Sequence, residues 1–175
     1  MLAVSNTPKR ILVTGATGYV GQPLCQALQS RGYAVCTFKG RLIPGGCGKH
    51  CGGVDAIIHC AAELRHRSEM YRTNVLGTKA MVAGAALAKV PQFLYVSTAS
   101  TRDTEYVRTK RKGEQIVASY SEQMNVKVVR LPTLYGGKRG PKWLQHLKLW
   151  LQGRPINLQS RDEAVQDILN AMESP

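Results

Sequence analysis

The chain has 175 residues, 43% of them hydrophobic and 20% charged, which is enough for one globular domain with a substantial core. No apolar run approaches the roughly 20 residues of a membrane span, and residues 1–8 lack the charged-then-apolar order of a signal peptide, so we expect neither membrane insertion nor export. Five cysteines are an odd number, and Cys25, Cys36 and Cys60 lie in apolar stretches that predict core positions. Cysteine usage therefore favours free thiols and a cytoplasmic location.

The net charge of +13 admits two kinds of partner. Clustered cations bind nucleic acid by releasing counterions, whereas a generally basic surface attracts a phosphorylated small molecule. The basic residues are spread along the chain with few aromatic residues among them. We therefore expect a phosphorylated small molecule and do not expect nucleic acid.

Apolar strands alternate with helical segments in this sequence, a pattern typical of a parallel sheet covered on both faces. The predicted strands are 11–13, 34–38, 56–60, 93–96 and 126–129, with a short one at 156–158. The predicted helices are 19–30, 69–89, 106–123, 142–151 and 162–172. In the last helix the apolar spacing turns Val165, Ile168 and Leu169 inward. We see no linker and predict a single domain over 1–175.

A glycine-rich turn, Gly15-Ala16-Thr17-Gly18-Tyr19-Val20-Gly21, follows the first strand and opens the first helix. Gly15 permits a tight turn, Gly18 lets the backbone approach a pyrophosphate, and Gly21 lets helix and strand pack closely. The helix N-terminus then presents free N–H groups to the anion. The turn predicts a dinucleotide site, with a ligand-free strand–helix turn as the alternative.

The end of the second predicted strand indicates which dinucleotide is preferred. An acidic residue there holds the ribose 2′-hydroxyl of NAD, but this chain reads Phe38-Lys39-Gly40-Arg41. Because Arg41 or Lys39 could pair with a 2′-phosphate, we predict NADP(H) over NAD(H). The alternative is that both are solvated loop cations and that NAD(H) is used.

Six motifs occur in an order that resembles the short-chain dehydrogenase/reductase superfamily, especially its extended branch of nucleotide-sugar epimerases and dehydratases. The matching segments are Thr14–Gly21 (TGxxGxxG), 55–62, ending in paired alanines, 74–78 (NVLGT), 95–98 (YVST), Tyr106 to Lys110 (YxxxK) and 130–136 (RLPTLYG). The resemblance implies a doubly wound, three-layer α/β fold of the Rossmann type. It also implies that Cys60, Ala61 and Ala62 lie beside the cofactor.

The resemblance further implies a proton-transfer site. Tyr106 and Lys110 are four apart and share a helix face, so an ammonium at Lys110 would lower the pKa of the phenol. Tyr106 would then be the general acid/base for an alcohol/carbonyl substrate, a sugar nucleotide among the candidates, and Thr98 would hydrogen-bond the same substrate oxygen. Lys110 would also hold the nicotinamide ribose.

Three features differ from the extended enzymes. The glycine-rich segment 39–53 occupies the place of a third strand and its helix, so we expect that strand to be missing or degenerate, with the order 2-1-4-5-6 and the second strand at an edge. Only seven residues separate Thr98 from Tyr106, and about 35 follow Gly140. The alternative function is therefore a non-catalytic, NmrA-like regulatory or structural module without a substrate pocket.

Two further features bear on metals and assembly. Cys47, His50 and Cys51, with Cys36, have zinc-binding side chains, but their spacing is not a standard zinc motif, so we expect mobile free thiols and no metal. The resemblance implies a homodimer that pairs helices 69–89 and 106–123. The alanine-rich stretch 80–88 fits such a contact or packing on the chain's own sheet.

Overall fold

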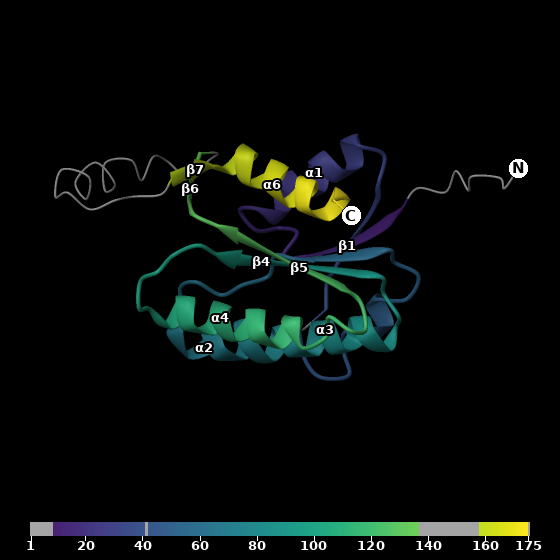
Figure 1. Ribbon diagram of the computed structural model, residues 1–175, viewed down its shortest axis with the longest axis horizontal. Helices are drawn as coiled ribbons and strands as arrows, with labels where there is room; N and C mark the ends of the chain where they lie inside the picture. The colour runs from purple at the N-terminus through teal and green to yellow at the C-terminus, as the bar shows by residue number, and fades with distance from the viewer. Residues whose placement is uncertain (1–8, 41, 137–157, 175) are drawn as a thin grey trace, which may run out of the picture.

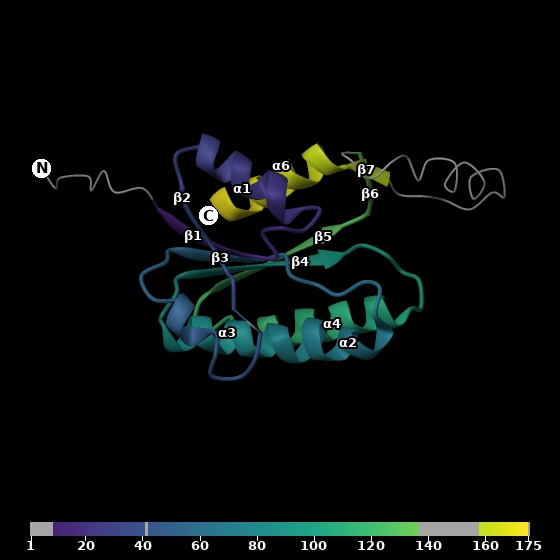
Figure 2. The ribbon, with the colours of Figure 1, turned by 180° about the vertical axis from the view of Figure 1, so that it is seen from behind.

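A computed structural model describes residues 9–40, 42–136 and 158–174. A central parallel sheet lies between two helical layers, with α1 and α6 on one face and α2, α3 and α4 on the other (Figures 1 and 2). The sheet strands are β1 (Arg10–Thr14), β2 (Ala34–Thr37), β3 (Ala56–His59), β4 (Gln92–Thr98) and β5 (Asn125–Leu131). The helices are α1 (Gly21–Ser30), η1 (Gly48–His50), α2 (Arg67–Tyr71), η2 (Arg72–Gly77), α3 (Thr78–Leu87), α4 (Glu105–Ala118) and α6 (Arg161–Glu173).

The strand order is β2-β1-β3-β4-β5, and every pair in this sheet is parallel. In β1, Val13 pairs with Thr37 of β2 on one side and with Ile58 of β3 on the other. No strand lies between β2 and β3 along the described chain, so the third strand of the expected arrangement is missing and β2 forms an edge. The structure thus confirms the shortened, doubly wound fold.

The sheet separates two apolar cores, as expected for strands buried on both faces. The core under α1 and α6 contains Leu24 and Leu28 with the predicted inward residues Val165, Ile168 and Leu169. The core under α3 and α4 is built around the buried residues Ile57, Met81, Val82, Phe93, Tyr95 and Val117. The alanine-rich helix α3 contributes Ala80 and Ala85 to this second core, so part of that stretch packs on the chain's own sheet.

Residues 47–51 of the glycine-rich segment pack against α3, contrary to the expectation of mobile thiols. Cys47 and Cys51 are 1% and 0% exposed and belong to the second core. Close approach is possible because Gly84 of α3 has no side chain: a Cβ there would lie 2.8 Å from the backbone nitrogen of Gly48. Burial raises the pKa of both thiols. In contrast, the three cysteines predicted for the core (Cys25, Cys36 and Cys60) are only half-buried.

Several element boundaries differ from the sequence prediction. The expected helix 69–89 is a continuous helical segment over 67–87 that consists of α2, η2 and α3, and its middle part, η2, is a π-helix. The helix predicted to end at 123 ends at Ala118, because turns closed by Tyr120 N–H to the Val117 carbonyl and Met124 N–H to the Tyr120 carbonyl reverse the chain into β5. A second, two-stranded parallel sheet pairs β6 (Thr133–Tyr135), inside the RLPTLYG segment 130–136, with β7 (Leu158–Ser160).

The predicted helix 142–151, Arg41 and residues 156–157 of the predicted last strand lie outside the described residues. Helix α6 begins with a capping box, in which Ser160 Oγ accepts from the Glu163 backbone N–H and the Glu163 carboxylate accepts from the Ser160 N–H. Among the described helices, none is both long enough and apolar enough to cross a membrane.

Candidate functional site

A cavity of about 490 Å³ lies where β1, β3 and β4 end. Its wall brings together segments that are far apart in sequence: the glycine turn, the chain after β3, the end of β4, the start of α4 and residues 131–135. Ten of the predicted site residues line it, namely Gly15, Gly18, Tyr19, Val20, Gly21, Cys60, Ala62, Thr98, Tyr106 and Lys110. The carboxyl edge of an open parallel sheet is where such folds bind ligands.

The glycine turn needs its glycines for three different reasons. Gly15 has φ +66°, and a Cβ there would lie 2.8 Å from the Ala61 backbone, so both conformation and space require glycine. A Cβ at Gly21 would overlap the Gly15 carbonyl oxygen. At Gly18, by contrast, the backbone has an ordinary φ, and a Cβ would meet only the Gly15 oxygen, at 3.0 Å, among the described residues. Gly18 therefore leaves space on the cavity side.

Helix α1 directs its N-terminus at this space. It begins at Gly21 after Val20, and no side chain caps it. The first N–H groups of a ten-residue helix with this geometry carry a partial positive charge. Tyr19 closes the turn on one side, because its hydroxyl donates a 2.6 Å hydrogen bond to the Gly136 carbonyl. The turn, the start of α1 without a side-chain cap and the open space at Gly18 fit a pyrophosphate group.

A buried polar chain fixes the ends of β1 and β3. The Ala61 N–H donates to Thr14 Oγ1 (3.2 Å), which lies 2.8 Å from His59 Nδ1, and His59 Nε2 lies 3.2 Å from Thr78 Oγ1. Because Thr78 Oγ1 donates to the Asn74 carbonyl, it must accept from Nε2, which assigns the Nε2–H tautomer to His59. Burial lowers the pKa of His59 to about 3, with a smaller contribution from Lys110, so the ring is neutral.

Asn74 of η2 connects the chain after β3 to helix α4. Its side chain accepts from the Glu63 N–H (2.7 Å) and donates to the Glu63 carbonyl and to Thr109 Oγ1. Thr109 Oγ1 donates in turn to the Tyr106 carbonyl at 2.8 Å. This network places residues 62–64 and the first turn of α4 on the same cavity.

Lys110 is buried, and its ammonium lies 4.0 Å from the centre of the Tyr95 ring. Burial lowers the pKa of Lys110 to about 7, with Cys60 and Glu114 opposing the shift. Burial raises the pKa of Tyr106, in the opposite direction to the sequence prediction. The physical reason is that desolvation of the phenol disfavours the phenolate, an effect that helical spacing does not reveal.

Thr98 is oriented as a hydrogen-bond donor. The Ser100 N–H donates to Thr98 Oγ1 at 3.2 Å, which leaves the hydroxyl proton free for another acceptor. Thr98 and Tyr106 both line the cavity. Both residues therefore border the same space.

Glu114 lies one turn after Lys110 and is 8% exposed. It accepts hydrogen bonds from Ser97 Oγ (2.5 Å), Arg111 Nη1 (2.8 Å) and Arg130 Nη2 (2.7 Å). Burial alone would raise the pKa of this carboxyl, but the donors outweigh burial and leave the pKa below its usual value. Sequence reasoning missed this cluster, although the four-residue spacing from Lys110 places both on one face of a helix.

The remaining predicted residues have different positions. Thr17 and Ala61 are not part of the cavity wall, although the Ala61 backbone abuts Gly15. Lys39 is exposed after β2, and Arg41 is outside the described residues. Sequence reasoning did not single out Leu64, Ser97, Ser100, Arg102, Thr104 and Tyr135, which also line the cavity. Ser100, Arg102 and Thr104 could have been found, because a seven-residue loop anchored at both ends on the site must stay near it.

Cys36, Cys47, His50 and Cys51 do not assemble a metal centre. Among the described residues there is no group of three or more His, Cys, Asp or Glu side chains that could hold a metal ion. Cys47 Sγ donates to the Ile43 carbonyl and Cys51 Sγ to the Cys47 carbonyl, so both thiols are turned into the core. His50 packs instead edge-on against Phe38, with ring centres 5.0 Å apart.

The order of the sheet, the covering helices and the glycine turn define a Rossmann-type fold. Residues 11–151 match the model of the NAD dependent epimerase/dehydratase family, and the chain belongs to that family.

Curated relatives agree with this assignment. The chain is 31% identical over 111 residues to a 2-alkyl-3-oxoalkanoate reductase of Stenotrophomonas maltophilia, covering 52% of this chain and 34% of the relative. It is 30% identical over 113 residues to the human sterol-4-alpha-carboxylate 3-dehydrogenase, decarboxylating, covering 54% and 30%. The chain therefore spans about a third of the length of these curated relatives.

Among solved structures, a UDP-glucuronic acid 4-epimerase from Bacillus cereus in complex with NAD superposes with a TM-score of 0.77 at 18% identity, over 94% of this chain and 72% of that one. At that level of identity the likeness establishes the fold.

Proposed function

We propose that this chain binds a nicotinamide dinucleotide and transfers hydride to or from an alcohol/carbonyl substrate. The observation that carries the proposal is that the glycine turn lines the same cavity as Thr98, Tyr106 and Lys110. Family membership and the reductase and dehydrogenase relatives support it. We also propose that residues 1–175 form one dinucleotide-binding domain.

The residues present fit the dinucleotide. The open space at Gly18 and the uncapped start of α1 would receive the pyrophosphate, and Cys60, Ala61, Ala62 and Lys110 would lie along the nicotinamide half. The nicotinamide supplies or accepts the hydride when bound.

Tyr106 would exchange a proton with the substrate oxygen, and Thr98 would donate a hydrogen bond to the same oxygen. Lys110 assists in two ways. Its pKa of about 7 lets it be charged or neutral near neutral pH, so its charge can favour the phenolate of Tyr106 when proton transfer requires it. It would also hold the nicotinamide ribose.

We infer a preference for NADP(H), as the sequence predicts, with Arg41 and Lys39 as the residues that pair with the 2′-phosphate. The support is that Phe38, Lys39 and Gly40, which directly follow β2, include no carboxylate that would repel a phosphate. An Arg41→Ala and Lys39→Ala double variant should therefore lose the preference for NADPH over NADH without losing NADH binding.

The substrate is proposed at the level of a small molecule with an alcohol/carbonyl pair. The relatives include a reductase of 2-alkyl-3-oxoalkanoates, and the structural neighbours include epimerases of sugar nucleotides. The rival function is the non-catalytic module. The raised pKa of Tyr106 favours it, because a phenol that stays protonated is a weaker base.

Turnover measurements separate the two functions. Wild type and Tyr106→Phe are each saturated with NADPH, and NADPH consumption is followed with a panel of ketones. An enzyme should lose about a hundredfold or more in kcat in Tyr106→Phe, with NADPH affinity unchanged, because only proton transfer is removed. If no carbonyl compound is reduced, or if the variant is as active as wild type, the enzyme proposal is wrong.

We further propose that the protein forms a homodimer and resides in the cytoplasm. Tyr71 and Leu76 are 47% and 44% exposed on the helical layer that the family resemblance assigns to dimer contacts, and five free thiols suit a reducing compartment. Sedimentation at micromolar concentration tests the dimer, and a monomeric mass would contradict it.

A further inference from the structure

The loop between β4 and α4 places a positive charge on the cavity that the proposed chemistry does not use. Ser100, Arg102 and Thr104 line the cavity, between Thr98 at the end of β4 and Tyr106 in the first turn of α4. Since both ends of this short loop are fixed at the candidate catalytic groups, Arg102 stays close to the place where a substrate oxygen would react.

We propose that Arg102 binds an anionic group of the substrate, a carboxylate or a phosphate carried close to the reacting carbonyl or hydroxyl. This inference rests on the proposed function and specifies its substrate class. Arginine suits the role because its planar guanidinium donates two parallel hydrogen bonds to either anion.

The charge balance of the cavity supports an anionic ligand beyond the dinucleotide phosphates. Its lining residues, all within the described parts of the chain, include the cations Arg102 and Lys110 and no carboxylate. Lys110 is buried over the Tyr95 ring, whereas Arg102 is exposed. The glycine turn and α1 serve the pyrophosphate from a different element, which leaves Arg102 for the substrate.

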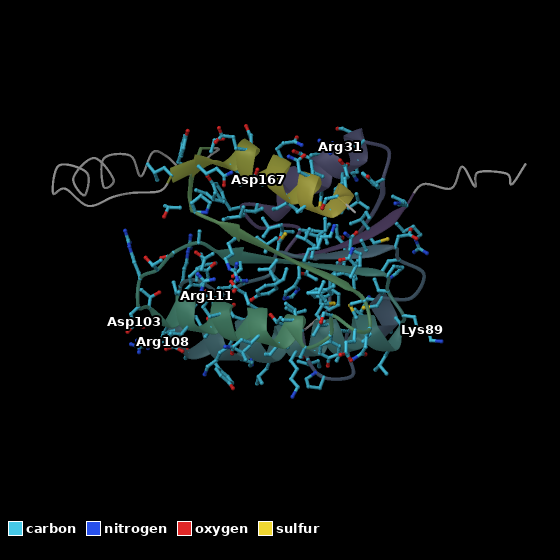
Figure 3. The ribbon with its side chains drawn as sticks, in the orientation of Figure 1. Arg31, Lys89, Asp103, Arg108, Arg111 and Asp167 are labelled. Carbon is cyan, nitrogen blue, oxygen red and sulfur yellow. The ribbon has the colours of Figure 1, made fainter. Side chains whose placement is uncertain are left out.

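The acidic residues around Arg102 are already engaged. Asp103 accepts from Arg108 Nε (2.7 Å) and Nη2 (2.8 Å), and Glu105 lies 3.5 Å from Arg108 Nη1. Figure 3 shows Asp103 and Arg108 side by side at this end of the molecule. Glu63 accepts from the backbone N–H groups of Arg65 and His66. Within the described chain, Arg102 itself forms no ion pair with any of these acids.

The loop backbone is organised before any ligand binds. The Arg102 N–H donates to Ser100 Oγ at 3.3 Å, and its carbonyl accepts from the Thr104 N–H at 2.9 Å. Thr104 then caps α4 by accepting from the Val107 N–H. A backbone held by these bonds loses little entropy when the side chain binds an anion, which favours affinity.

Matched charged and neutral ketones test the proposal. Acetoacetate is compared with its methyl ester, and dihydroxyacetone phosphate with dihydroxyacetone, by calorimetry against the free protein and against its NADP⁺ complex. The oxidised cofactor prevents turnover, and the two pairs distinguish a carboxylate from a phosphate ligand. The variants are Arg102→Gln and the control Lys89→Gln, which removes a positive charge at the opposite end of the molecule (Figure 3).

For wild type and Lys89→Gln, we expect at least one charged ketone to bind about tenfold to a hundredfold more tightly than its neutral partner, and we expect Arg102→Gln to remove this preference. The proposal is overturned if neutral and charged ketones bind wild type equally, if neither binds, or if the preference survives in Arg102→Gln. A failure to bind NADP⁺ would count against the proposed function alone, since the free protein still reports the preference for anions.

Discussion

The buried ammonium of Lys110 should make the stability of this protein depend on pH in a way that one substitution removes. Lys110 is 1% exposed, and burial lowers its pKa to about 7 from the 10.5 of a solvated lysine. Between these values the unfolded chain keeps a proton that the folded chain has lost. Folding is therefore favoured as the pH rises above the folded pKa, and the penalty for burying the charge is fully present below it.

The size of the effect follows from linkage. Each pH unit between the two pKa values changes the free energy of unfolding by about 1.4 kcal/mol, so wild type should gain about 2 kcal/mol between about pH 7 and about pH 8.5. Lys110→Met keeps the length of the side chain and its packing on the Tyr95 ring but has no proton to lose. The free energy of unfolding of wild type minus that of Lys110→Met should therefore rise by about 2 kcal/mol between about pH 7 and about pH 8.5.

Urea unfolding of both proteins at several pH values in this window measures the difference, and subtraction cancels groups that titrate in both. Lys112→Met is the matched control, because it makes the same substitution at an exposed position of the same helix. A constant difference between wild type and Lys110→Met would refute the reasoning, since it would mean that Lys110 keeps its proton in the folded state.

Three further comparisons of variants test other contacts. Gly21→Ala should lower the free energy of unfolding by about 1–3 kcal/mol, because its Cβ overlaps the Gly15 carbonyl, whereas Gly18→Ala should lose dinucleotide affinity with a smaller loss of stability; equal losses of stability in urea unfolding would contradict this. Gly113→Ala should be destabilised by a similar amount, about 1–3 kcal/mol, because its Cβ would overlap the Tyr95 hydroxyl. Adding Tyr95→Phe to this variant should restore much of the lost stability, whereas purely additive effects of the two substitutions would argue against the contact. Wild type should be more stable than Glu114→Gln by a constant amount above about pH 5, and this advantage should fall as the pH drops through the lowered pKa of Glu114. If the difference between the two melting temperatures does not change with pH, the hydrogen bonds of the Glu114 carboxylate are not the source of the advantage.

Much of the fold could be predicted because its signals are local. Buried strands such as 56–59 are short apolar runs, and the glycine turn has a spacing that few other structures require. The same local reasoning predicted which face of α6 is buried and that the segment after β2 lacks a strand. The end of α4 was predicted five residues late, since residues 119–123 are compatible with a helix and only the pairing of β5 with β4 makes the chain turn.

Features that depend on burial were harder to predict. Cys47 and Cys51 have no periodic pattern, and their burial depends on a gap at Gly84, far away in sequence. The pKa of Tyr106 was predicted to fall from its spacing to Lys110, but the desolvation of both side chains dominates. Arg102 was overlooked because a loop cation is usually solvated, and only the cavity shows that its loop faces the site.

We propose that the cavity beside Gly18 holds a nicotinamide dinucleotide. Fluorescence titration of NADPH and NADH into wild type and Gly18→Asp tests it directly, because an aspartate there would place a negative charge where the pyrophosphate should lie. We predict saturable binding to wild type, tighter for NADPH than for NADH, and a loss of about tenfold or more in Gly18→Asp. No saturable binding to wild type, or equal binding to both proteins, would contradict the claim.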